Sequence, residues 1–233
     1  MELKIGIMQP YFLPYIGYFS LINAVDKFVL ADDLQYIRRG WVNRNKIKMQ
    51  GHSQYITVPV KRAPIATQIN KMELISPEGS AYVLKRTMEA NYGCCPFFHE
   101  IKNLTFDLLG PIANLSDLNV ALIKRVCDYL KIRTPLHMSS KLNGDASLRR
   151  EYRIQSICKT LGCTHYINPI GGINLYSKAD FSKLGLTLSF LKMNDIVYPQ
   201  GKDGFIPFLS IIDVLMWNSS ADVRKMLDDY ILL

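Results

Sequence analysis

The chain has 233 residues, of which 48% are hydrophobic and 21% charged, and its formal net charge at pH 7 is +8. This composition is ordinary for a globular protein and argues against a disordered or fibrous chain. No uninterrupted apolar run reaches the ~20 residues of a membrane span, and the first residues do not read as a signal peptide. We therefore expect a cytoplasmic protein without a membrane span.

The length and even composition predict a single domain over residues 1–233, with a mainly helical middle segment at 78–133. The five cysteines include no C-x-x-C pair, so they predict neither a disulfide framework nor a zinc site, and we expect no bound metal. The positive charge favours an anionic ligand, such as a nucleotide, a phosphate, a sugar nucleotide or RNA, without choosing among them.

The N-terminal part begins as an open α/β sheet. An apolar strand over Lys4–Met8 is followed by a loop and a helix, and a second strand over Phe28–Ala31 ends at Asp32 and Asp33. Such sheets bind ligands in the crevice beyond the C-terminal ends of their strands. This rule places Gln9, Asp32 and Asp33 at a candidate site.

A β-hairpin is expected after the second strand. Its two strands are predicted at Asn43–Lys48 and Gln54–Val60, with a turn at Met49–Ser53 between them. A further short strand is predicted at Lys71–Ile75.

The middle of the chain is predicted to be helical. One helix begins after Ser76 at Pro77, a second covers Pro96–Leu109, and a third covers Leu115–Leu130. Either Ser116 or Asp117 is expected to cap the third helix.

The last third alternates again between helices and strands. Helices are predicted at Arg149–Leu161, Ser177–Leu184 and Ile206–Trp217, and strands at Thr164–Ile167 and Leu186–Leu191. The whole pattern predicts an α/β fold with a mainly parallel open sheet, a Rossmann-like start, an inserted β-hairpin and a central helical block.

The first loop has a distant likeness to the strand–loop–helix of nucleotidyltransferases that carry an H-x-G-H signature. The corresponding residues here are Tyr15-Ile16-Gly17-Tyr18, and both histidines are missing. A nucleotide-binding loop with Tyr18 as a contact therefore stands beside a plainer interpretation, in which Gly17 allows close helix packing.

Asp32 and Asp33 end a strand, where a carboxylate can bind ribose hydroxyls, hold a metal or act as a base. Because Asp also favours turns and helix caps, a structural role is the alternative.

The segment Trp41–Lys46 combines a flat aromatic ring, amides and cations. Along a strand, Asn43 and Asn45 share one side, and Arg44 and Lys46 share the other. Such a strand offers partners for sugar hydroxyls and phosphate oxygens, and an arginine fork matches two phosphate oxygens. An exposed hairpin strand without a ligand is the alternative.

Two C-terminal segments add candidates. Asn168 ends a predicted strand and is followed by Gly171-Gly172, whose backbone N–H groups can cradle an anion, although Gly-Gly pairs also mark ordinary turns. Asp213 lies in an apolar helix, where an ionised carboxylate needs a partner, so an internal bond to an arginine or to a loop N–H is favoured over catalysis.

Four segments together resemble the WbqC-like protein family, and the likeness runs nearly from end to end. They are Ile7–Phe19, Trp41–Ile47, Tyr166–Gly172 and Leu209–Asn218. The family is bacterial and is often encoded among O-antigen and other surface-polysaccharide genes, and its chemistry is poorly defined. The resemblance implies a pathway rather than a reaction and supplies no established catalytic residues.

Pathways of this kind often acylate amino sugars, so the resemblance implies acyl or aminoacyl transfer to the amine of a nucleotide-linked amino sugar. Asp32 or Asp33 is then the expected base, and Asn43 or Asn168 a donor to the developing oxyanion. The residues expected to bind substrate are Gln9, Tyr18, Trp41, Asn43, Arg44, Lys46, Asn168, Gly171 and Gly172.

Two other functions stay open: an ATP-using ligase or nucleotidyltransferase-like enzyme, and a non-catalytic sugar-nucleotide-binding protein. No tightly bound cofactor is expected, although a nucleotide or an acyl or aminoacyl donor can serve as co-substrate. The expected partners are a nucleotide-linked sugar and either an acyl carrier or aminoacyl-tRNA, and a homodimer is an open alternative.

Overall fold

The computed structural model describes residues 2–142, 148 and 151–233. Its main sheet has six strands in the order β5-β2-β1-β6-β7-β8. Their bounds are β1 Lys4–Met8, β2 Lys27–Leu30, β5 Leu136–Met138, β6 His165–Pro169, β7 Thr187–Met193 and β8 Tyr230–Leu232. The first five in this order pair in parallel, and β8 pairs antiparallel with β7 at the edge. The expected α/β class with a mainly parallel sheet is therefore confirmed.

Strand β1 lies at the point where the strand order reverses. The chain moves from β1 to β2 and β5 on one side, and then to β6 and β7 on the other. Ile5 pairs with Lys27 of β2 and with Tyr166 of β6. The crevice between the ends of β1 and β6 is thus the topological switch point, where open α/β sheets bind ligands.

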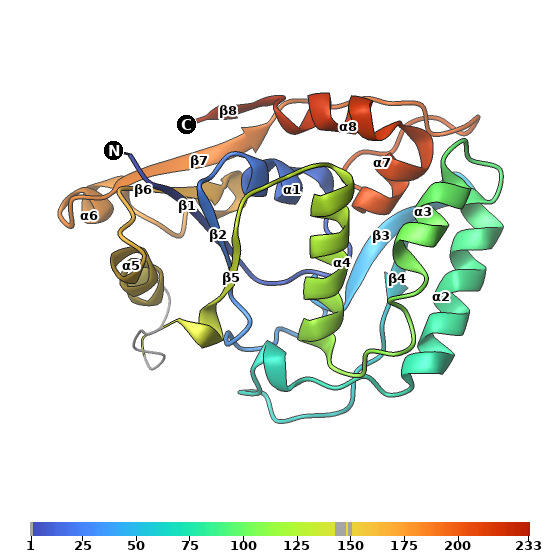
Figure 1. Cartoon of the computed structure of the whole chain (residues 1–233), viewed down its shortest axis with the longest axis horizontal. Coiled ribbons are helices and arrows are strands. Elements are labelled where there is room, and N and C mark those ends of the chain that lie inside the picture. Colours follow the sequence, from blue (N-terminus) through green and yellow to red (C-terminus); the bar gives the residue numbers. More distant parts are fainter. Residues whose placement is uncertain (1, 143–147, 149–150) are drawn as a thin grey trace.

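Helices cover both faces of the sheet, because both faces of its central strands are apolar. Ile5, Ile7 and Val29 face a core shared with α5 (Glu151–Thr160) and α6 (Lys178–Ser182). Phe28 and Leu30 face the opposite core, which includes α1 (Ile16–Asn23), α4 (Leu115–Tyr129) and α8 (Ser220–Leu227). In Figure 1, α5 and α6 lie to the left of the strands and α4 to the right.

The predicted hairpin forms a second, two-stranded sheet from β3 (Arg44–Met49) and β4 (His52–Thr57). It lies beside α2 (Pro77–Tyr92), α3 (Phe98–Thr105) and α7 (Ile211–Trp217) on the right of Figure 1. Ile47 and Ile56 of the hairpin belong to the same apolar core as α1 and α4. The hairpin therefore packs against the side of the sheet that carries the opening loop.

Three local predictions are wrong. Residues 71–75 form no strand, because after the 3₁₀ turn η1 (Ile69–Lys71) the segment makes only isolated bridges. The cap of α4 is Asn114, whose side chain accepts a hydrogen bond from the Asp117 N–H at 3.1 Å. Helix α7 begins at Ile211, five residues later than predicted, because Phe208 has a φ of +58°. Ser210 caps this helix.

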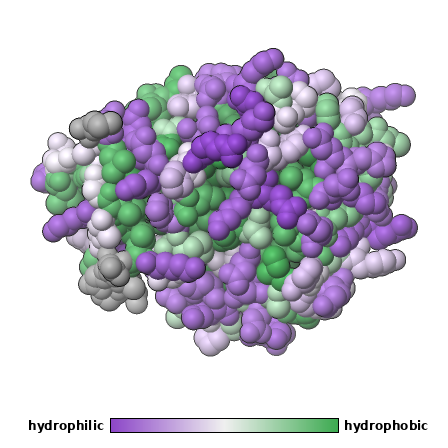
Figure 2. Space-filling model, viewed as in Figure 1, coloured by the Kyte–Doolittle hydropathy of each residue, from purple (hydrophilic) through white to green (hydrophobic). Residues whose placement is uncertain are grey.

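None of the helices that the structure describes is both long and apolar enough to cross a bilayer. Figure 2 shows hydrophilic residues over much of the visible face, with apolar patches between them.

Candidate functional site

A cleft of about 410 Å³ opens at the switch point between β1 and β6. This volume lies within the range of ~300–1,000 Å³ that is usual for small-molecule sites. The cleft is lined by the ends of both strands, the residues after β2, helix α5 and the turn after β6. These residues are Ile7, Met8, Gln9, Tyr11, Ala31, Leu34, Ile154, Asn168, Pro169, Gly171, Gly172, Leu175 and Tyr176.

Gln9 and Tyr11 supply unoccupied polar groups to this cleft. Both side chains are partly buried, and neither makes a side-chain hydrogen bond with any residue that the structure describes. Burial raises the pKa of the Tyr11 hydroxyl, so this group stays protonated near neutral pH. A partly buried amide and hydroxyl without protein partners are suited to the donors and acceptors of a polar, uncharged ligand.

Asn168 and Gly172 form a tightly fitted corner of the cleft. The buried Tyr166 hydroxyl donates to Oδ1 of Asn168 at 2.8 Å, and Nδ2 donates to the Pro169 carbonyl at 3.0 Å. A Cβ atom at position 172 would lie 1.8 Å from Nδ2 of Asn168, whereas one at Gly171 would meet nothing within 4 Å. Only a glycine at 172 therefore leaves room for the Asn168 amide, whose second N–H remains for a ligand.

The opening loop from Gln9 to Tyr15 is held by side chains from distant parts of the chain. Nδ2 of Asn119 donates to the Pro10 carbonyl at 2.8 Å. Nδ2 of Asn45 lies 3.1 Å from the Phe12 carbonyl and 2.8 Å from that of Leu13, which also accepts a hydrogen bond from the Ser210 hydroxyl at 2.7 Å. The loop that presents Gln9 and Tyr11 is thus fixed before any ligand arrives.

Tyr18 lies behind this loop and outside the cleft lining. It is almost fully buried, and its hydroxyl donates to the Gln9 carbonyl at 2.9 Å. Burial raises the pKa of Tyr18 well above its ordinary value. A Cβ at Gly17 would lie 2.3 Å from the Tyr15 hydroxyl, which agrees with the packing interpretation of that glycine.

Asp32 flanks the cleft as part of a hydrogen-bonded cluster. Its carboxylate accepts from the Ser139 hydroxyl, from the N–H and hydroxyl of Ser140, and from the Asn70 amide, at 2.6–3.2 Å. Four donors fill the oxygens of this buried carboxylate and tie the end of β2 to η2 (Ser139–Lys141), which follows β5.

Asp33 belongs to the same cluster. It forms an ion pair of 2.7 Å with the buried Arg153 of α5 and also accepts from Ser139. Because one hydroxyl carries one proton, Ser139 can donate to only one of the two carboxylates at a time. Neither aspartate is among the residues that line the cleft.

The hairpin candidates also lie outside the cleft lining. Nδ2 of Asn43 donates to the Val58 carbonyl at 2.9 Å, and its Oδ1 accepts from the Tyr36 hydroxyl at 2.9 Å. Arg44 donates to the carbonyls of Gly40 and Arg39. Asn43 and Arg44, which were predicted from the sequence to bind substrate together with Gln9, do not line the cleft that Gln9 lines, because both side chains brace the hairpin itself.

The exposed Trp41 and the half-buried Arg44 and Lys46 cluster around the exposed Tyr55. The Arg44 guanidinium lies 4.2 Å from the centre of the Tyr55 ring, the Lys46 ammonium 5.3 Å, and the Trp41 ring 6.1 Å. The predicted division of the strand is correct, since Asn43 and Asn45 point inward and the cations point outward.

Sequence reasoning missed several residues of the site. Tyr11 and Tyr176 line the cleft, Arg153 pairs with Asp33, and Asn119 holds the opening loop. Of these residues, only Asn119 could have been found from the sequence. It is an amide within the apolar face of a helix, and such an amide needs a buried partner. Among the described residues, no three His, Cys, Asp or Glu side chains lie close enough together to hold a metal ion.

The chain is similar to known sequences over nearly its whole length. The model of the WbqC-like protein family matches residues 9–225. An uncharacterized protein of Mycobacterium tuberculosis is 32% identical over 231 residues, which cover 96% of this chain and 97% of that protein. No solved structure matches the chain.

Proposed function

This chain belongs to the WbqC-like protein family, and we propose that it binds a nucleotide-linked amino sugar in the β1/β6 cleft and transfers an acyl or aminoacyl group to the sugar amine. The reaction would serve the biosynthesis of O-antigen or another bacterial surface polysaccharide in the cytoplasm. The observation that carries the proposal is the amide of Gln9, which has no partner among the described residues and lies at the switch point with Asn168.

The lining of the cleft suits the sugar part of such a ligand. Among the described residues it contains amides, hydroxyls and apolar surface but no charged side chain. Sugar hydroxyls both donate and accept hydrogen bonds, as amides and hydroxyls do, so Gln9, Tyr11 and Asn168 are matched partners. Gly171 and Gly172 place no side chain at the rim, where a diphosphate can approach the backbone.

The transfer itself requires an acyl donor, a base and an oxyanion partner. The amine nitrogen forms a bond to the acyl carbonyl carbon, the donor's leaving group departs with the bonding electron pair, and the amine proton passes to the base. Asp33 is assigned this role in preference to Asp32, because Asp32 accepts three hydrogen bonds besides that of the shared Ser139 hydroxyl. Asp33 is paired with Arg153 and flanks the cleft without lining it, so the role requires the sugar amine to reach past the lining residues. The free N–H of Asn168 is assigned to the developing oxyanion.

The proposed acyl donor is a polyanionic molecule, either an acyl carrier or aminoacyl-tRNA. The net charge of +8 favours association with either. The half-buried cations and exposed rings around Tyr55 are the surface on which such a carrier would dock.

Binding and turnover are measured separately to test this proposal. Titration calorimetry with UDP-glucosamine, UDP-N-acetylglucosamine and UDP should show the tightest binding for the sugar with a free amine. Gln9→Ala should weaken that binding by about tenfold, the equivalent of one or two hydrogen bonds. Gln54→Ala, which removes an exposed amide from β4, is the matched control and should bind as the unaltered protein does.

Mass spectrometry then follows the mass of the amino sugar in the presence of acetyl-CoA, acyl carrier protein or aminoacyl-tRNA. A mass increase equal to one acyl or aminoacyl group supports the transfer. Consumption of ATP with release of diphosphate would instead support the ligase or nucleotidyltransferase alternative. Tight binding with no turnover of any donor would identify a non-catalytic binding protein.

A further inference from the structure

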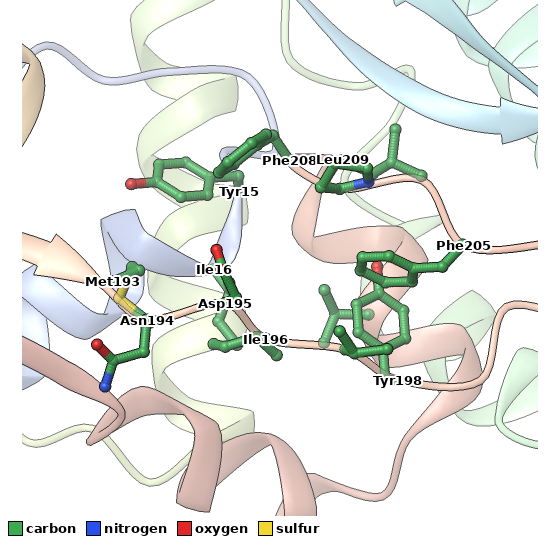
Figure 3. Close-up of a pocket in the computed structure, with 13 residues that line it drawn as sticks. Tyr15, Ile16, Met193, Asn194, Asp195, Ile196, Tyr198, Phe205, Phe208 and Leu209 are labelled. Atoms are coloured by element: carbon green, nitrogen blue, oxygen red, sulfur yellow. The ribbon is translucent and has the colours of Figure 1, made fainter.

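A second cavity, of about 350 Å³, lies beyond the end of β7, between the start of α1 and the segment that leads to α7. Apolar and aromatic side chains form most of its wall. Figure 3 shows the rings of Tyr15 and Phe208 on one side of the opening and those of Phe205 and Tyr198 on the other. The Tyr198 and Phe205 rings meet edge to face, with centroids 5.3 Å apart. None of the residues that line the cleft between β1 and β6 also lines this cavity.

The described residues that line the cavity include no Lys, Arg or His, although the chain carries a net charge of +8. The only charged residue among those that line it is Asp195, whose exposed carboxylate has no ion-pair partner among the described residues. Aromatic faces carry negative charge in their quadrupole, so the rings and the carboxylate both disfavour an anion. A neutral or positively charged ligand with an apolar body fits this wall.

Tyr15 is fixed against the first turn of α1. Its hydroxyl lies so close to Gly17 that a Cβ there would be 2.3 Å away, and it makes no hydrogen bond with the described residues. Burial raises the pKa of this hydroxyl, which therefore remains a neutral donor. Besides Asp195, the apolar wall thus carries the Tyr15 hydroxyl as a polar group without a partner among the described residues.

The backbone conformation and the exposure of Phe208 are not explained by packing within the protein. Its φ of +58° is a left-handed conformation that costs a bulky residue free energy, and its side chain is 75% exposed. An exposed phenyl ring recovers little of that cost from burial in the protein itself. A ligand that covers the ring would offset this free-energy cost by burying the ring.

We propose that this cavity is a second binding site, for a small ligand with an aromatic or branched apolar body and no negative charge. The site is independent of the amino-sugar cleft. The ligand's apolar body lies between the rings of Tyr15, Tyr198 and Phe205 under Phe208, and its hydroxyl or ammonium group faces the Tyr15 hydroxyl or Asp195.

Three probes with the same phenyl body but different charges test the proposal: 2-phenylethanol, 2-phenylethylamine and phenylacetate. Binding is followed by NMR on protein labelled with ¹³C at the methionine methyl groups. Met193 lines the cavity, and the fully buried Met88 of α2 is the internal control. The alcohol and the amine should shift the Met193 signal, which is assigned by Met193→Leu, and leave that of Met88 in place. The carboxylate should bind about tenfold more weakly because of the unfavourable charge.

A pair of variants separates binding from folding. Phe208→Ala should weaken binding of the alcohol and the amine by about tenfold, whereas Tyr82→Ala, which removes a similarly exposed ring on α2, should not. Phe208→Gly should melt at or above the temperature of the unaltered protein, since glycine adopts this φ without strain. Equal affinity for all three probes, no shift at Met193, or unchanged affinity in Phe208→Ala would each overturn the proposal.

Discussion

The side-chain amide of Asn45 donates a hydrogen bond to the carbonyl of Leu13 across 2.8 Å. Leu13 has a φ of +43°, which a branched residue adopts only when its surroundings hold it there. The hairpin strand β3 therefore fixes the shape of the loop that leads from β1 to α1. Two of the segments that resemble the family, at Ile7–Phe19 and Trp41–Ile47, meet at this contact.

Replacing Asn45 with alanine should destabilise the fold. The change leaves the Phe12 carbonyl without this donor and removes one of two donors from the Leu13 carbonyl, in a buried place that water does not reach readily. Asn45→Ala should lower the free energy of unfolding by about 1–3 kcal/mol, as measured by urea denaturation. Asn103→Ala, on the exposed side of α3, is the matched control and should change it little. Equal stabilities of the two variants would show that the contact does not hold the loop.

The two neighbouring glycines after β6 should respond differently to alanine. Gly172→Ala places a methyl group against the Asn168 amide and should displace it from the Tyr166 hydroxyl. A clash of this kind in a packed region costs about 1–3 kcal/mol, so its melting temperature should fall by several degrees. Gly171→Ala has open space and should melt close to the unaltered protein. An unchanged melting temperature of Gly172→Ala would mean that the close contact with Gly172 does not fix the Asn168 side chain.

The buried carboxyl of Asp213 should make stability depend on pH. It accepts hydrogen bonds from the hydroxyls of Tyr92 at 2.7 Å and Tyr198 at 2.9 Å. From the sequence we expected an internal partner, but an arginine or a loop N–H rather than tyrosine hydroxyls. Burial raises the pKa of Asp213, against the opposing effects of these hydrogen bonds and of Lys48. The folded protein therefore holds this proton more tightly than the unfolded chain does.

The contribution of Asp213 is fully present below the unfolded pKa of ~4 and is lost as the pH rises through the raised folded value. The difference in unfolding free energy between the unaltered protein and Asp213→Asn should consequently decrease as the pH rises from about 4 toward neutrality. Urea denaturation across this range measures it. A difference that grows with pH would show that the folded-state pKa is lowered instead.

Cysteine accessibility tests the packing of the helices. Cys94 is exposed, whereas the other four cysteines are buried. Burial also raises the pKa of Cys95 and of Cys127 to about 12, so both carry little thiolate at pH 8. Iodoacetamide should therefore modify Cys94 quickly in the native protein and the buried thiols only after denaturant is added. Rapid native-state labelling of Cys95, its neighbour in the chain, would contradict the described packing of this turn.

The sequence predicted the parallel strands well, because their local signal is strong. Ile5 and Ile7 face one core while Phe28 and Leu30 face the other, so these strands are apolar on both faces and read as buried sheet. Strand β5, at Leu136–Met138, has only three residues and gave no such signal. Its place beside β2 depends on long-range pairing that no local pattern encodes.

Which residues gather at the cleft was predicted in part, and whether they bind a ligand stays a prediction. Gln9 and Gly172 follow strand ends and Asn168 lies in the last two residues of β6, so the rule for open sheets brings them together. Asn43 and Arg44 were grouped with them on residue type alone, yet their partners are carbonyls of the hairpin and its preceding turn. Residue type shows which hydrogen bonds a side chain can make, but only the tertiary contacts show whether other protein groups already take them up.

The most direct test of the amino-sugar cleft is the side-chain amide signal of Gln9 in a ¹H–¹⁵N NMR spectrum, assigned by its loss in Gln9→Ala. Addition of UDP-glucosamine should shift this signal in proportion to occupancy, together with that of Asn168. The amide of Gln54, on the exposed hairpin strand, should stay in place and serves as the control in the same spectrum. If the sugar binds while the Gln9 and Asn168 amides do not move, the ligand lies elsewhere and the proposed function of this cleft is wrong.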